Sequence, residues 1–432
     1  MATLLSADLL LSRKRLRKRL RRKGRSQLAI LRARRKLLLN FAHFGEKSQI
    51  IRKLSDAYRF QLKDVGSNVV VTTPKVFSII EDPVNAVATI QGFARALTQR
   101  KVAKIQINQD KTEVYDLAAM ALLDLVATEF TYEAKKRGQR IRFAGQYPHS
   151  RGLKRFVKSM GIVKHLKVKH EAAVASEIRV FEKRRRHYFP HTDPRKVDFK
   201  SATVRSFVDH IDSCLKDHKR VLNVESRAKL CDYVGEILGN AEDHPGFADW
   251  TIQGYLDNSL DTPICEIAIF NFGKSIAETL KELPSNSYTW LQVDPYVKLH
   301  NGRNFFSKTW SQSDLLTLIA LQGHVSSKNN DLEDTRGQGM GDLIDFFQRM
   351  HNDCAPESRS KAKMVVLSGG TYILFDGKYQ MRESTTHGRV IAFNAENDLH
   401  SKPDPAYVRS LESFHFPGTV ISIRFPLGAL VL

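Results

Sequence analysis

Glu236 and Asn240 are the first residues of this chain whose types and spacing allow chemistry. They stand four apart in residues 231–244, where apolar residues recur at helical spacing, so both side chains are expected on one face of a helix, one turn apart. A carboxylate can act as a general base, and an amide oxygen can ligate a hard cation such as Mg²⁺. The pair alone is a weak signal, because this spacing occurs by chance on many solvated helix faces.

Two further stretches combine glycines with a predicted strand or helix. A buried strand is expected to end at Asn271, and Gly273 lets the chain turn tightly after it. Downstream, three alternate glycines, Gly337, Gly339 and Gly341, open a helical pattern. Glycines at the start of a helix allow backbone N–H groups to approach an anion, which the helix dipole also favours.

The fourth stretch is a predicted strand with a glycine entry at residue 418 and a proline stop at residue 426. Taken in this order, the four stretches resemble the ATP-binding domains of the GHKL superfamily, which includes gyrase, the ninety-kilodalton heat-shock chaperone, histidine kinases and MutL. The resemblance covers about residues 200–432. The matches are Glu236 and Asn240 to the N box, residues 271–276 to the D-x-G-x-G box, residues 337–341 to the glycine box, and Gly418-Thr419 to the terminal strand.

The resemblance implies a role for each matched residue. Glu236 would orient or deprotonate the attacking nucleophile, and Asn240 would ligate Mg²⁺ between the phosphates. Asn271 would accept a hydrogen bond from the adenine amino group. Gly273 would let the base lie against the backbone, and Thr419 would support the adenine end.

The remaining matched residues are implied to contact the nucleotide as well. Gly337, Gly339 and Gly341 would border a mobile lid over residues 324–336 and meet the phosphates, and Ile276 closes the adenine-box match. Lys328 is the lid candidate for contact with the terminal phosphate, the alternative being a solvated charge.

The chain departs from the family pattern at two positions. The usual Asp of the adenine box is Asn271 here, and Ser275 stands where the family has its second glycine. An Asn carbonyl can still accept from the adenine amine, but without charge assistance. The departures leave adenine selectivity open, and they favour the alternative of a site that keeps the fold without turnover.

The composition sets broad limits. The 432 residues, with 42% hydrophobic content, suffice for two or three domains with proper cores. No apolar run is long enough to span a bilayer. The four cysteines lie far apart without a C-x-x-C pair, which predicts a reducing, cytoplasmic setting and argues against a zinc site or a disulfide framework.

Positive charge is concentrated at the N-terminus. Residues 1–40 contain fourteen Lys or Arg and a single acid, Asp8, so more than half of the net charge of +22 lies there. We interpret residues 1–45 as a basic arm that binds nucleic acid through phosphate contacts or lies on an anionic surface. The alternatives are a charged helix that packs by its leucines, a partly disordered tail, or a transit peptide, which the arm superficially resembles.

Residues 46–165 alternate predicted strands and helices, which indicates a small α/β sheet. The order of elements from Ile105 to Gly145 resembles a STAS domain, in which regulated members carry a phosphorylatable Ser or Thr where the following helix begins. Residues 115–119 contain no hydroxyl apart from the phenol of Tyr115, and Thr112 is the nearest candidate. We therefore expect a module that docks a protein partner.

Residues 166–200 are basic and are predicted to be a linker. Its basic run, residues 183–186, is interpreted as an extension of the basic surface or as a solvated linker. His187 and His191 lack the neighbouring ligands that a metal site would need.

The expected fold class is therefore α/β (α+β). Residues 201–432 would form a GHKL sandwich with a mixed or antiparallel sheet, joined by the linker to the STAS-like domain of residues 46–165. The first functional hypothesis is a bacterial, Mg²⁺-dependent ATP-binding switch with slow ATPase activity, in regulation or defence, that controls engagement of a protein or nucleic-acid partner. The alternatives are a Ser/Thr protein kinase resembling the anti-sigma-factor kinases and a non-enzymatic, nucleotide-bound scaffold that binds nucleic acid. A homodimer is left open.

Overall fold

The computed structural model describes most of the chain after the basic arm. The described residues are 24, 27, 48–59, 67–99, 102–161, 177–185, 199–243, 247, 249–322, 325, 338–354, 356–384, 388–411 and 414–427. Residues 1–40, predicted to bind nucleic acid, lie almost entirely outside the described residues. The same holds for Lys328, Gly337, His187 and His191. In the part described, no helix combines the length and the apolarity needed to cross a bilayer.

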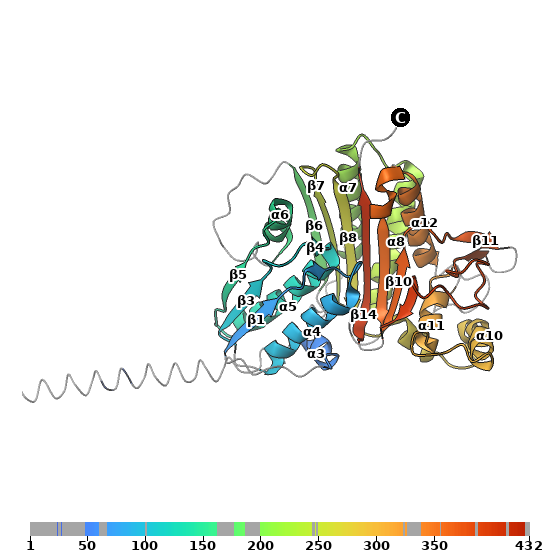
Figure 1. Ribbon diagram of the computed structural model, residues 1–432, viewed down its shortest axis with the longest axis horizontal. Coiled ribbons are helices and arrows are strands. Elements are labelled where there is room, and N and C mark those ends of the chain that lie inside the picture. Colours follow the sequence, from blue (N-terminus) through green and yellow to red (C-terminus); the bar gives the residue numbers. More distant parts are fainter. Residues whose placement is uncertain are drawn as a thin grey trace, which may run out of the picture.

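A seven-stranded sheet forms the centre of the molecule (Figure 1). Its order is β13-β10-β9-β14-β8-β7-β6, and every neighbouring pair is antiparallel. The mixed α/β class with an antiparallel sheet is therefore confirmed. The strands are β6 (Ile178–Arg185), β7 (Trp250–Asp257), β8 (Ile264–Phe272), β9 (Lys363–Gly369), β10 (Thr371–Phe375), β13 (Val408–Ser410) and β14 (Phe416–Pro426).

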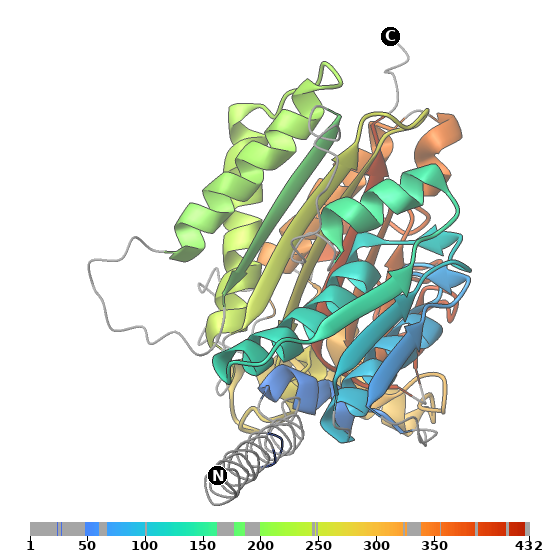
Figure 2. The same ribbon diagram turned by 90° about the vertical axis from the view of Figure 1, so that its left-hand side faces the viewer.

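Helices cover one face of this sheet (Figure 2). The long ones are α7 (Phe199–Lys216), α8 (Val224–Asp243) and α12 (Gln338–Asn352). Further elements continue this layer at the edge, namely α9 (Ile276–Lys281), α10 (Tyr288–Gly302), α11 (Gln312–Ala320), the 3-10 helix η3 (Pro356–Lys361) and the hairpin of β11 (Arg382–Ser384) and β12 (Gly388–Val390). Helix α11 is capped by Ser311 and Asp314, which form a reciprocal capping box.

The N-terminal unit contains a second, parallel sheet. Its order is β1-β3-β5, from β1 (Asn68–Thr72), β3 (Lys104–Asn108) and β5 (Arg142–Gln146), beside a two-strand ladder of β2 (Val76–Phe77) and β4 (Val114–Tyr115). The helices are α3 (Gln49–Asp56), α4 (Pro83–Gln99), α5 (Leu117–Lys136) and α6 (Arg151–Met160). The predicted alternation of strands and helices is present.

Helices α4 and α5 lie between the two sheets (Figures 1 and 2). Strand β8 shows why, since its side chains alternate: Ile267 and Ile269 face α7 and α8, whereas Ala268 and Phe270 belong to the core shared with the N-terminal unit. Fifteen of the twenty residues of α5 are buried, as expected of a helix covered on both sides. The sheet and the N-terminal unit therefore share one hydrophobic core.

Hydrogen bonds join the N-terminal unit to the seven-stranded sheet. Glu266 of β8 accepts a hydrogen bond from Leu117 N at 2.6 Å, at the start of α5, and Tyr372 OH donates to Ile80 O at 2.6 Å. Arg424 of β14 donates to Tyr115 O and lies 3.4 Å from Glu266. Burial raises the pKa of the Glu266 carboxyl above its usual value, although Arg424 opposes this.

The prediction of a linker over residues 166–200 is wrong in its middle part. Ile178–Arg185 form β6, which pairs with β7 over eight residues and closes one edge of the sheet. Arg184, within the predicted basic surface, points into an ion-pair cluster with Glu129 and Asp249 instead of into solvent. Polar residues dominate this strand because it lies at the sheet edge, which made its alternation hard to recognise.

Candidate functional site

Helix α8 brings Glu236 to the edge of a pocket. The helix buries Leu230, Val234 and Leu238 against the sheet, so Glu236, two residues before Leu238, lies at the border of the buried face, half-buried. Asn223 supports the start of the helix, since its side-chain oxygen accepts from Ser226 N at 2.7 Å. The predicted helix is confirmed, and it presents its carboxylate to a cavity.

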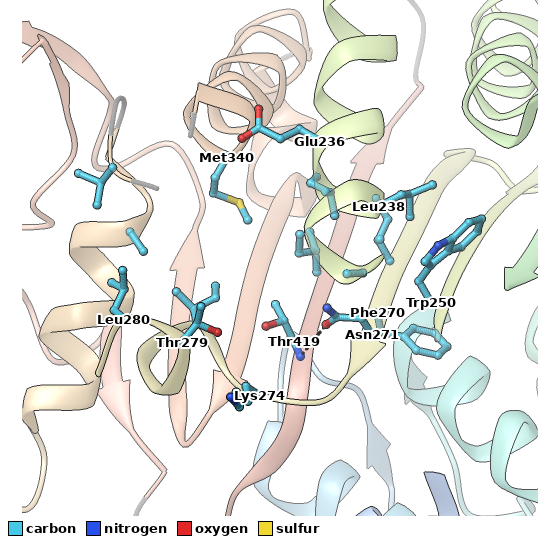
Figure 3. A pocket seen from close by; sticks show the side chains of 17 residues that line it. Glu236, Leu238, Trp250, Phe270, Asn271, Lys274, Thr279, Leu280, Met340 and Thr419 are labelled. Carbon is cyan, nitrogen blue, oxygen red and sulfur yellow. Dashed lines mark hydrogen bonds between the residues drawn. The ribbon is translucent and has the colours of Figure 1, made fainter. Parts of the chain in front are cut away.

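The pocket lies between α8, α9 and the ends of β8 and β14, and it encloses about 940 Å³ of space, its open mouth included. Figure 3 shows Glu236 and Met340 toward one end and Asn271 and Thr419 toward the other. The lining is mostly apolar and comprises Glu236, Ile237, Leu238, Ala241, Trp250, Ile269, Phe270, Asn271, Lys274, Ile276, Thr279, Leu280, Ala320, Val325, Met340, Thr419 and Ile421.

Four of the predicted site residues therefore line one cavity, although they are far apart in the chain. They are Glu236, Asn271, Ile276 and Thr419. Asn240 lies in α8 one turn after Glu236, and its side chain is outside the described part. Its neighbour Ala241 lines the pocket, so the last turns of α8 border the cavity.

Asn271 and Thr419 face each other across the β8–β14 pair. Thr419 N donates to Asn271 Oδ1 at 3.0 Å, and the Thr419 hydroxyl lies 2.8 Å from that of Ser368. Gly418 has φ +136°, and a Cβ there would lie 2.2 Å from the backbone oxygen of Asn271. Only glycine fits at this close approach. Gly273, at φ +142°, makes the turn that follows β8 as predicted.

Ser275, at the position of the missing glycine, caps helix α9. Its hydroxyl accepts from Glu278 N, and the Glu278 carboxylate accepts from Ser275 N at 2.7 Å. Burial would raise the pKa of Glu278, but the hydrogen bonds from Ser275 outweigh it and hold the pKa below its usual value. The departure from the family pattern thus has a structural role, which is to begin α9 at the edge of the pocket.

The glycine stretch lies inside α12 as far as it is described. The helix begins at Gln338, so Gly339 and Gly341 belong to its first turn, as expected of glycines that open a helix. Between them, Met340 turns its side chain into the pocket (Figure 3). Arg389 of β12 ion-pairs with Asp342 and Asp345 and so ties α12 to the β11–β12 hairpin.

Several pocket residues were missed by sequence reasoning. Sequence patterns do not distinguish the apolar residues of a pocket wall from core residues, because both follow the same periodicity. The missed residues include Trp250, Leu280 and Met340, together with Thr279. Lys274 could have been recognised from the sequence, because it is a cation that directly follows the predicted turn at Gly273. It lines the pocket and forms an ion pair with Glu282.

The residues at this site fit a Mg²⁺ ion only in one mode. Among the described residues there is no cluster of three or more His, Cys, Asp or Glu able to hold a metal ion. Magnesium bound with nucleotides commonly takes one or two protein oxygens and completes its octahedron with phosphates and water. Residue 240, one helical turn after Glu236, is the position that the motifs assign to such an oxygen, and Glu236 at the pocket remains the candidate general base.

Comparisons of the chain with models of protein families, with curated proteins and with solved structures found no match. The resemblance to GHKL and STAS domains therefore depends on the motifs and element order of this chain alone.

Proposed function

We propose that this protein is a Mg²⁺-dependent nucleotide switch. Its pocket would bind a nucleoside triphosphate, ATP being the one that the motif resemblance implies. Hydrolysis would be slow and assisted by Glu236, and the nucleotide state would control engagement of a protein partner through the N-terminal unit or of nucleic acid through the basic arm. One observation carries the proposal: Glu236, Asn271 and Thr419, drawn from three separate motifs, line a single pocket.

The arrangement of the pocket supports distinct roles for its two ends. The end near Asn271 and Thr419 combines hydrogen-bonding groups with apolar walls, which suits a base. The end near Glu236 and the start of α12 would then receive the phosphates, where helix N-termini favour anions. Glu236 would hold the attacking water or hydroxyl as a general base, and bound Mg²⁺ would neutralise charge on the phosphates.

Contacts between the sheet and the N-terminal unit support the switch part of the proposal. Strands β8 and β14 carry Asn271 and Thr419 at the pocket, and the same strands carry Glu266 and Arg424, which bind the backbone at the start of α5. A shift of these strands on nucleotide binding would therefore reach the N-terminal unit directly. Coupling of this kind needs two arrangements of the interface with different nucleotide affinities.

The proposal is tested with nucleotides labelled at the terminal phosphate, ATP and GTP in parallel, each with Mg²⁺. Free phosphate and labelled protein are followed together for the wild type and for Glu236→Ala. We expect release of free phosphate that falls at least about a hundredfold in Glu236→Ala, the usual contribution of a general base, while binding persists. Label on a protein would identify a kinase instead. Normal turnover by Glu236→Ala, or no binding of either nucleotide, would reject the proposal.

A further inference from the structure

The parallel sheet of the N-terminal unit has one face that no described helix covers. Figures 1 and 2 show β1, β3 and β5 at the outside of the molecule, with α4 and α5 on their inner side. In β1 and β3 the side chains alternate, so that Val69 and Ile105 are buried against the helices whereas the residues on either side of them point outward. The outward positions of the sheet are Asn68, Val70, Thr72, Lys104, Gln106, Asn108, Arg142, Ala144 and Gln146.

These nine outward positions hold two cations and no acid. The register places Lys104 beside Arg142 at the start of the strands. Along β3, Lys104 Nζ donates to Gln106 Oε1 at 3.3 Å, and Gln106 Nε2 donates to Asn108 Oδ1 at 3.2 Å. The face therefore combines positive charge at one end with a row of amides, which can both donate and accept hydrogen bonds.

Helix α6 adds a second group of cations at the other end of the strands. Arg151, Lys154 and Lys158 follow one another at the spacing i, i+3 and i+7, so they lie on one face of this helix. The ammonium groups of Lys154 and Lys158 lie 5.6 and 5.9 Å from the centroid of the Tyr147 ring, and Tyr147 directly follows β5. No described carboxylate forms an ion pair with either lysine, so both charges are available to a ligand.

The sequence concentrates positive charge in this region. Residues 134–161, from the last turn of α5 to the C-cap of α6, contain nine Lys or Arg and no Asp or Glu. Charge of one sign at this density attracts an anionic polymer or an anionic membrane. Binding to a membrane also uses apolar side chains that insert, and only Val70 and Ala144 are apolar among the nine outward positions. Unpaired nucleic-acid bases fit better, because their edges offer donors and acceptors to the amides while the cations contact phosphates.

We propose that the outer face of β1, β3 and β5, together with the basic face of α6, binds single-stranded nucleic acid. The cations contact phosphates at the two ends of the strands, and Gln106, Asn108 and Gln146 meet the edges of unpaired bases. A duplex is disfavoured, because its base edges lie in grooves that the flat face of a three-stranded sheet does not enter. The inference is independent of the nucleotide pocket, and it adds a contact on the folded body to the one proposed for the basic arm.

The test measures the affinity of the full chain for labelled single-stranded RNA and DNA of about twelve nucleotides, and for duplexes of the same length, by fluorescence anisotropy over a range of salt concentrations. Wild type is compared with the double variant Arg142→Gln with Lys154→Gln. The matched control is Arg303→Gln with Lys308→Gln, which removes the same charge from exposed positions at and after the end of α10, on the far side of the molecule (Figure 1). The basic arm is present in all three proteins, so its contribution is common to them. Thermal unfolding verifies that each variant is folded.

We expect the slope of log affinity against log salt to become shallower by about 1.4 in the Arg142 and Lys154 variant, about 0.7 for each lost phosphate contact with a single strand, and to stay unchanged in the control. The loss of affinity should be greater for single strands than for duplexes. A change with either RNA or DNA supports the inference, and the strand with the larger change identifies the source.

Equal slopes for the two double variants, or a loss confined to duplexes, would overturn the inference. Sedimentation with vesicles that contain phosphatidylserine tests the membrane reading in parallel. A variant that loses vesicle binding but keeps its affinity for single strands would assign this surface to a membrane instead. Each of these outcomes is separate from nucleotide turnover, so the proposed function stands or fails on its own test.

Discussion

Arg184 of β6 and Asp249 form a two-pronged ion pair, with Nε–Oδ1 and Nη2–Oδ2 distances of 3.2 and 2.9 Å. The same guanidinium donates to Glu129 of α5 at 2.7 Å. This geometry joins the edge of the large sheet to the N-terminal unit, and it explains why a strand with so many charges is held in place. All three side chains are largely buried, so each charge depends on its partners.

Arg184→Met is expected to destabilise the protein by about 3 kcal/mol or more, because it leaves two buried carboxylates without their cation. The matched control is Arg179→Met on the same strand, where the ion pair with Asp217 is exposed and should contribute at most about 1 kcal/mol. Urea unfolding of both variants measures the difference. Equal costs would show that the Arg184 cluster does not hold β6 to the N-terminal unit.

Gly418→Ala should destabilise the fold by about 3 kcal/mol, since the left-handed backbone is strained for alanine and the new Cβ collides with the Asn271 backbone. Nucleotide binding should weaken with it, because the same collision displaces Asn271. Gly235→Ala, in α8 with open space around its Cα, should instead stabilise by up to about 1 kcal/mol. Thermal unfolding and nucleotide titration provide both readouts. A tolerated Gly418→Ala would contradict the close approach of β14 to β8.

The substitution Glu278→Gln tests the capping box of α9 through the pH dependence of the unfolding free energy. The folded-state pKa of Glu278 is lowered, so the carboxylate contributes stability above its unfolded pKa of about 4.5 and loses it as pH falls through the folded value. The wild type should therefore exceed the variant in unfolding free energy at pH 7, modestly because Glu278 is partly exposed, and the difference should diminish as the pH falls below about 4.5. Urea unfolding across this range measures it. A difference that grows toward acid pH would contradict the assignment.

Asn240→Ala should lower nucleotide affinity at least about tenfold in the presence of Mg²⁺ and have little effect when the metal is chelated, because the amide oxygen is proposed to act through the ion. Asn301→Ala on α10 serves as the control. Calorimetric titrations with and without Mg²⁺ separate the two contributions. Loss of affinity that is independent of Mg²⁺ would remove Asn240 from the metal site.

Deletion of residues 1–40 tests the basic arm. We expect the full chain to shift nucleic acid in a gel with an affinity that falls steeply as salt is raised, because the contacts would be phosphate contacts that release counterions. The truncated chain should lose most of this binding and keep its nucleotide affinity. Unchanged nucleic-acid binding after the deletion would exclude the arm as the contact.

Local signals made much of this structure predictable. The apolar periodicity of α4 and α8, the Ser311–Asp314 cap and the turn at Gly273 depend on residues within a few positions of each other. The four motifs also indicated which residues would meet, and Glu236, Asn271 and Thr419 do line one pocket. The helices, the cap and the turn are determined by the sequence because the physical forces behind them act over one or two turns of chain, whereas the meeting of the motif residues was indicated by the resemblance.

Tertiary structure alone decided the rest. Strand β6 joins the sheet through register with β7, some seventy residues later, and the N-terminal unit covers the face of β8 that carries Phe270. The orientation of the Asn271 amide is set by Thr419 N, which is 148 positions away. Such pairings depend on which surfaces and which backbone donors meet in the folded chain, and no local pattern encodes the partner. Four of the pocket residues could thus be anticipated, whereas the orientation of the Asn271 amide emerged only from the pairing of two distant strands.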